Sequence, residues 1–99
     1  MLMFKQLFFL HKSENEQSIP PFYESVHQNL EELTGKKIKI GKIENNLLLD
    51  QKYSYFFDAE FESKTRMDEL MSTNAGKLLT KSLMDFHKKI TIISINYDN

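Results

Sequence analysis

The sequence predicts an α+β domain whose strands and helices follow one another in the order βαββαβ. An apolar run near the start and a β-branched run near the end both have the composition of strands. Between them lie one segment that alternates with period two, one aromatic segment, and stretches whose apolar residues recur at helical spacing. In this order the strands form an antiparallel sheet with its helices on one face. Because 99 residues is the usual length of one domain, we expect residues 1–99 to form a single unit.

The first half of the chain predicts a strand, a helix and a second strand. Residues 3–10 are almost wholly apolar, which suits a strand covered on both faces. A helix can begin at Pro21 but not before it, and Gly35 suits the left-handed residue that follows a helix. Residues 37–43 alternate polar and apolar side chains, which predicts a strand with one buried face. The helix carries an apolar stripe at helical spacing: Phe22, Val26, Leu30 and Leu33.

The second half predicts an aromatic strand, a broken helix and a final strand. Turn-forming residues between 45 and 51 predict a loop or an irregular hairpin before the strand at 53–61. Ser63 or Thr65 suits the cap of the next helix, which is short and is followed by a second helical piece. The β-branched and aromatic segment 90–97 predicts the last strand.

Composition excludes several classes of partner. The formal net charge is only -1, so there is no general field to attract nucleic acid, and we expect none to bind. Cysteine is absent, which rules out disulfides and thiolate metal sites and suits a cytoplasmic location. The three histidines are scattered without zinc-site spacing, so no metal is expected. No apolar run approaches the roughly 20 residues that cross a bilayer, and we expect no membrane partner.

The predicted sheet has apolar and aromatic residues on both of its faces. The helices cover only one of them, and the other would expose a larger apolar patch than monomers normally tolerate. Two such sheets packed face to face, in a closed dimer, would cover it. The sequence therefore predicts a homodimer.

Several features, taken in order, carry a resemblance to a known family. A first strand leads to a polar loop, and residues 22–30 (FYESVHQNL) are an aromatic-containing helix with a central His that ends at Gly35. The third strand runs into residues 61–63 (FES), and residues 71–77 (MSTNAGK) are a break rich in small residues. In this order the chain resembles, over nearly its whole length, the EthD-like family of the dimeric α+β barrel superfamily. The resemblance implies a ferredoxin-like fold and a dimeric barrel. Asn29 and Thr34 stand where the family often has Pro, and a shared fold does not imply a shared ligand.

His27 is the candidate catalytic residue. It flanks the apolar stripe of the first helix and lies four positions after Tyr23, so both side chains project from neighbouring turns toward one ligand site. A neutral imidazole is a competent acid-base group near pH 7, and the resemblance places this His at the cavity end of the helix. The alternative is that His27 binds a nearby carbonyl or water and orients the adjoining loop.

Other side chains are candidates for ligand binding. His11 closes the first strand and would approach the same cavity, although a solvated strand end also explains it. His87 suits a helix C-terminus without any function. Asp58 and Glu60 lie together on one strand face, where ion pairs with lysines account for them. On the other face three aromatic residues suit the lining of an apolar pocket, or a core or dimer interface: Tyr53, Tyr55 and Phe57.

Three functions fit these residues. The first is an enzyme or a carrier that needs no cofactor and that binds or transforms a small apolar organic molecule in a cavity beside the first helix. The second is a monooxygenase of the same superfamily, cofactor-free or haem-dependent, against which stand the absence of Trp and of a convincing axial-ligand context. The third is a non-catalytic dimerisation module, whose barrel would be filled by some of the eight Phe and five Met.

Overall fold

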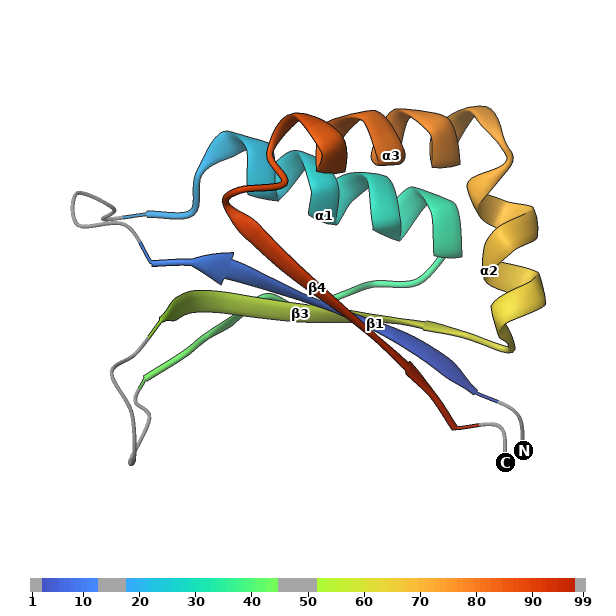
Figure 1. Ribbon diagram of the computed structural model, residues 1–99, viewed down its shortest axis with the longest axis horizontal. Coiled ribbons are helices and arrows are strands. Elements are labelled where there is room, and N and C mark those ends of the chain that lie inside the picture. The colour runs from blue at the N-terminus through green and yellow to red at the C-terminus, as the bar shows by residue number, and fades with distance from the viewer. Residues whose placement is uncertain (1–2, 13–17, 45–51, 98–99) are drawn as a thin grey trace.

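The computed structural model describes residues 3–12, 18–44 and 52–97, and their elements follow the predicted order. The elements are β1 (Phe4–His11), α1 (Pro21–Thr34), β2 (Gly41–Lys42), β3 (Tyr53–Phe61), α2 (Lys64–Met71), α3 (Asn74–Asp85) and β4 (Ile90–Asn96). The strands form one antiparallel sheet in the order β2-β3-β1-β4. The helices lie together on one side of this sheet, with α1 beside α3 (Figure 1). The fold is therefore the predicted α+β arrangement of one sheet and one helical layer.

The bounds of α1 follow from its flanking residues. Pro20 is extended, with φ -65° and ψ 146°, and Pro21 opens the helix, where its missing N–H costs nothing. Gly35 has φ 69°, a left-handed conformation that favours glycine, and its N–H donates to the Glu31 carbonyl at 2.9 Å. Both predicted ends of this helix are confirmed.

The core lies between the helices and the sheet. Tyr23, Val26 and Leu30 of α1 are fully buried there. Phe22, the first residue of the predicted stripe, is half-buried against this core and also stacks on Phe86, with ring centroids 4.4 Å apart. Side chains on the helix-facing side of β1 and β3 complete the core: Phe4, Phe8, Leu10, Phe57, Ala59 and Phe61.

At the break between α2 and α3 the two helices approach each other closely, and a hydroxyl group caps the start of each helix. The Ser63 Oγ accepts the Arg66 N–H at 3.1 Å at the start of α2, as predicted, and the Thr73 Oγ1 accepts the Gly76 N–H at 3.2 Å at the start of α3. A Cβ atom at position 76 would lie 2.4 Å from the Cα of Met71. Glycine is therefore needed for the two helices to meet this closely.

The predicted strand at 37–43 is mostly wrong. Gly41 and Lys42 pair with β3 and the Ile43 N–H donates to the Ser54 carbonyl at 2.9 Å, whereas residues 37–40 run outside the sheet as the connection from α1 to β2. The alternating pattern still identifies the side chains that face the core, because Ile38 and Ile40 pack against it. The physical reason is that side chains of α1 bind the backbone of Ile38 in place of a strand partner. The loop predicted between 45 and 51 lies outside the described residues.

The second face of the sheet carries no helix in the part of the chain that the structure describes (Figure 1). Leu7 pairs with Asp58 on one side and with Ile93 on the other, so these three side chains share this face. The same register adds the remaining members of this surface, which we call the helix-free face: Lys5, Phe9, Phe56, Glu60, Thr91 and Ile95. Its centre is apolar, and Ile93 is 45% exposed.

Tyr53 departs from the strict alternation that the sequence predicted for β3. The register of β1 and β3 shifts between Leu10 and His11, so that His11 pairs with Tyr53 while Leu10 pairs with Tyr55. As a result the Tyr53 ring lies 5.0 Å from the Phe9 ring, on the helix-free face, and not on the face that carries Phe57.

Over the described residues, no helix is long and apolar enough to span a membrane.

Candidate functional site

His27 lies at the edge of the core, on the side of α1 that faces the connection to β2. Its side chain is 16% exposed, and its ring stands edge-on to Phe57 with centroids 5.4 Å apart. Its Nε2 atom is 2.5 Å from the carbonyl oxygen of Ile38. Since a carbonyl oxygen only accepts, Nε2 must carry the proton of this hydrogen bond. In the neutral ring Nδ1 is therefore the basic nitrogen, able to take a proton.

Glu31 completes this arrangement one turn further along α1. Its Oε2 accepts the Ile38 N–H at 2.8 Å and lies 3.7 Å from His27 Nε2. The two side chains thus hold both backbone polar groups of Ile38. Glu31 is a site residue that was not predicted from the sequence, although its position four residues after His27 on a helix indicates contact.

Tyr23 and Phe57, two other predicted site residues, are packed into the core beneath His27. The Tyr23 ring is 4.9 Å from the Phe57 ring, which in turn stacks on Phe8 at 5.0 Å. The Tyr23 hydroxyl donates to the carbonyl of Phe8 at 2.9 Å, and all three side chains are fully buried. These rings fill the space between the middle of α1 and the sheet. The structure therefore brings Tyr23, His27 and Phe57 together.

The remaining predicted residues lie elsewhere. His11 Nε2 is 2.6 Å from the Thr91 Oγ1, and its ring lies 5.7 Å from Tyr53, so these three residues form a separate cluster at the end of β1. Tyr55 is half-buried against the core. His87 Nδ1 lies 2.9 Å from the Met84 carbonyl near the end of α3. The part of the chain that the structure describes holds no group of three metal-ligating side chains.

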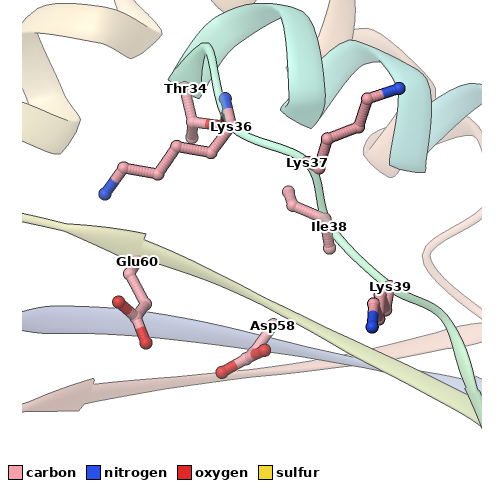
Figure 2. A pocket seen from close by; sticks show the side chains of 7 residues that line it. All are labelled: Thr34, Lys36, Lys37, Ile38, Lys39, Asp58 and Glu60. Atoms are coloured by element: carbon pink, nitrogen blue, oxygen red, sulfur yellow. Dashed lines mark hydrogen bonds between the residues drawn. The ribbon is translucent and has the colours of Figure 1, made fainter.

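A groove of about 260 Å³ adjoins the His27 arrangement, on the outer side of Ile38. Figure 2 shows the connection after α1 on one side of the groove and β3 on the other. Lys37 points away from the β3 carboxylates. A second hollow of about 160 Å³ shares part of the same lining. The residues around the first groove are mostly charged: Thr34, Lys36, Lys37, Ile38, Lys39, Asp58 and Glu60.

The carboxylates of the groove are neutralised in part by Lys5. Its Nζ lies 3.2 Å from Glu60 and 3.5 Å from Asp58, which confirms the ion-paired strand face that the sequence predicts. The hydrogen bond to Glu60 raises the pKa of Lys5, desolvation opposes this, and the charges of Glu60 and Asp58 add to the rise. Within the described residues, the lysines at 36, 37 and 39 have no carboxylate at ion-pair distance. The groove is therefore lined mainly by charged side chains, whereas Ile38 itself packs against the apolar core.

Comparison with known proteins places this geometry on a known fold. An ethyl tert-butyl ether d (EthD) family protein from Bacillus halodurans C-125 matches with a TM-score of 0.72 and 20% identity, over 94% of this chain and 96% of that one. A hydroxynitrile lyase from Passiflora edulis matches with a TM-score of 0.66 and 13% identity, over 99% and 94%. A dimeric ferredoxin-like protein of unknown function from Jannaschia sp. CCS1 matches with a TM-score of 0.67 and 14% identity, over 94% and 97%.

These likenesses confirm the EthD-like resemblance and the ferredoxin-like α+β fold class at the level of fold. No family model matches the sequence, and neither does any curated protein. At such low identities the shared fold carries no activity from one protein to another.

Proposed function

We propose that this chain is a single EthD-like domain that works as a cytoplasmic homodimer and binds a small organic molecule beside α1, with His27 as its polar anchor. The ligand is mostly apolar, because the side chains packed beneath His27 are aromatic. His27 would serve as an acid-base group if the bound molecule is also transformed.

The helix-free face supports the dimer. Leu7, Phe9 and Phe56 are half-buried in a single chain, and Ile93 beside them is 45% exposed. Burying such a surface contributes about 25 cal/mol per Å² of apolar area, which favours a second copy over water. Two of the structures with the same fold, from Jannaschia sp. CCS1 and Thermobifida fusca YX, are described as dimeric.

The placement of His27 is the observation that carries the ligand site. Its ring is mostly buried and touches Phe57, yet its hydrogen bond goes to the backbone of a connection outside the sheet. A ligand that takes the place of Ile38 would find a polar donor beside an aromatic surface, which is the usual composition of a small-molecule site. The groove next to it is lined in part by Ile38, the residue that a ligand would displace.

A filled dimerisation module is the second candidate, and the core beneath His27 favours it. Tyr23, Phe8 and Phe57 are fully buried against one another, and the Tyr23 hydroxyl is already bound to the Phe8 carbonyl. In this case His27 and Glu31 would only fix the connection to β2, and no small molecule would bind beside them.

A ligand screen separates the two candidates. Mixtures of small organic compounds are added to isotope-labelled wild-type protein, and the imidazole resonances of His27, His11 and His87 are followed by NMR. The proposal expects compounds that shift the His27 signals and leave those of His87, which is exposed just after α3, unchanged. If no compound shifts the His27 signals, even where compounds shift the signals of other residues, the result favours the filled module.

A further inference from the structure

We infer that the α1–β2 connection occupies the His27 site as an internal substitute for the ligand, and that the ligand offers a hydrogen-bond acceptor beside a donor, spaced as in one amino-acid residue. The inference rests on the proposed function, because it takes His27 as the anchor of the ligand. It adds to that function a chemical class and a second anchoring residue, Glu31.

The contacts of Ile38 define the chemistry of the site. His27 Nε2 donates to its carbonyl oxygen at 2.5 Å, and Glu31 Oε2 accepts its N–H at 2.8 Å. The donor and the acceptor come from adjacent turns of α1 and lie 3.7 Å apart. A pair of this kind satisfies an acceptor and a donor at the same time, as in an α-amido or α-hydroxy carbonyl compound.

The way the connection is held makes it replaceable. Residues 37–43 have the sequence of a strand, but the pairing with β3 begins only at Gly41. The polar groups of Ile38 are therefore satisfied by two side chains rather than by a ladder of backbone hydrogen bonds. A ligand with matching groups is able to replace them without breaking the sheet.

The apolar part of the ligand follows from the surroundings of Ile38. This side chain is half-buried and packs against the core, next to the His27 ring that stands on Phe57. A ligand that displaces the connection would place its own apolar group there. The class is thus a compact molecule with an aliphatic or aromatic group attached to neighbouring acceptor and donor groups.

An internal occupant lowers the observed affinity for any ligand, because only the fraction of molecules with the connection displaced can bind. Ile38→Ala weakens the packing that holds the connection in place and leaves both anchoring side chains intact. Ile40→Ala is the matched control: Ile40 is also half-buried against the core, but neither His27 nor Glu31 binds its backbone.

The test uses N-acetyl-L-isoleucine N-methylamide, a one-residue compound with the required groups, titrated into labelled protein and followed by amide shifts. We expect Ile38→Ala to bind it about tenfold more tightly than wild type and Ile40→Ala do. Adding Glu31→Ala to Ile38→Ala should abolish this gain. Ile38→Val is a smaller truncation, so it should also bind the compound more tightly than wild type, but by a smaller factor. It takes the place of Ile38→Ala in the test if Ile38→Ala unfolds.

Equal affinities of the Ile38 and Ile40 variants would overturn the inference, as would a gain that survives Glu31→Ala. The proposed function fails on a different observation, namely that no compound in the ligand screen shifts the His27 signals. The titration does not depend on that screen, because its probe is a defined compound.

Discussion

The Tyr23 hydroxyl donates a hydrogen bond to the main-chain carbonyl of Phe8 at 2.9 Å and so joins the first turn of α1 to the middle of β1. Because Tyr23 is fully buried, removing this hydroxyl leaves a buried acceptor with one bond fewer. We expect Tyr23→Phe to lower the free energy of unfolding by about 1–3 kcal/mol, measured by urea denaturation.

Tyr55→Phe is the control for this change. Tyr55 is half-buried, and its hydroxyl makes no hydrogen bond within the described residues, so its loss should be smaller. If both variants lose the same stability, the bond to Phe8 is not what makes Tyr23 important.

Gly76→Ala should be strongly destabilising. The added Cβ would lie 2.4 Å from the Cα of Met71, and both atoms belong to helix ends that would have to separate. We expect a loss of about 3 kcal/mol in the free energy of unfolding, despite the better helix propensity of alanine. Gly41→Ala is the control, because its nearest atom would be the Phe56 carbonyl oxygen at an ordinary 3.8 Å. Equal losses in the two variants would contradict the close contact of α2 and α3.

Ile93→Lys should dissociate the proposed dimer. Ile93 lies on the helix-free face and is 45% exposed in one chain, so a lysine there would be buried without a partner on dimerisation. Ile92 is the matched control, since it is 39% exposed on the same strand but pairs with Phe8 and faces the helix side. Sedimentation equilibrium should give a monomer for Ile93→Lys and a dimer for wild type and Ile92→Lys. A dimer for all three would exclude the helix-free face as the interface.

Lys5 predicts a pH dependence on the alkaline side. Its pKa is raised above the ordinary 10.5, chiefly by the hydrogen bond to Glu60, so its contribution to stability is complete below pH 10.5 and is lost as the pH rises through the raised value. The stability difference between wild type and Lys5→Met, measured by urea denaturation from pH 8 to 11.5, should therefore shrink at the alkaline end. Lys77→Met, at an exposed position of α3, should show no such trend. A constant difference for Lys5→Met would contradict the ion pairs.

The sequence was sufficient for elements whose ends are fixed by local chemistry. Pro21 and Gly35 bound α1 whatever it packs against, and the Ser63 hydroxyl caps α2 through a bond within one turn. The connection at Ile38 was mispredicted as a strand, because an alternating pattern reports a buried face but not a hydrogen-bond partner. Its partners are side chains from α1, which only the tertiary structure brings near.

The candidate site was predictable only in part, for the same reason. Helical spacing was enough to associate His27 with Tyr23, and the structure brings Phe57, predicted separately on its strand, into contact with both. It was not enough to show that Tyr23 is committed to the Phe8 carbonyl. Nor did it separate Tyr53 from Phe57, because a register shift in the sheet moves Tyr53 to the other face and leaves no mark in the composition.

The central claim is that His27 anchors a small organic ligand beside α1, and the most direct measurement is the dissociation constant of one screened ligand for wild type, His27→Ala and His87→Ala. The free energy of unfolding is measured on the same samples. We predict that His27→Ala binds at least about tenfold more weakly while staying folded, since a hydrogen bond to the ligand is lost, and that His87→Ala binds as wild type does. An unchanged affinity for His27→Ala, or a loss of folding that accounts for its weaker binding, would contradict the claim.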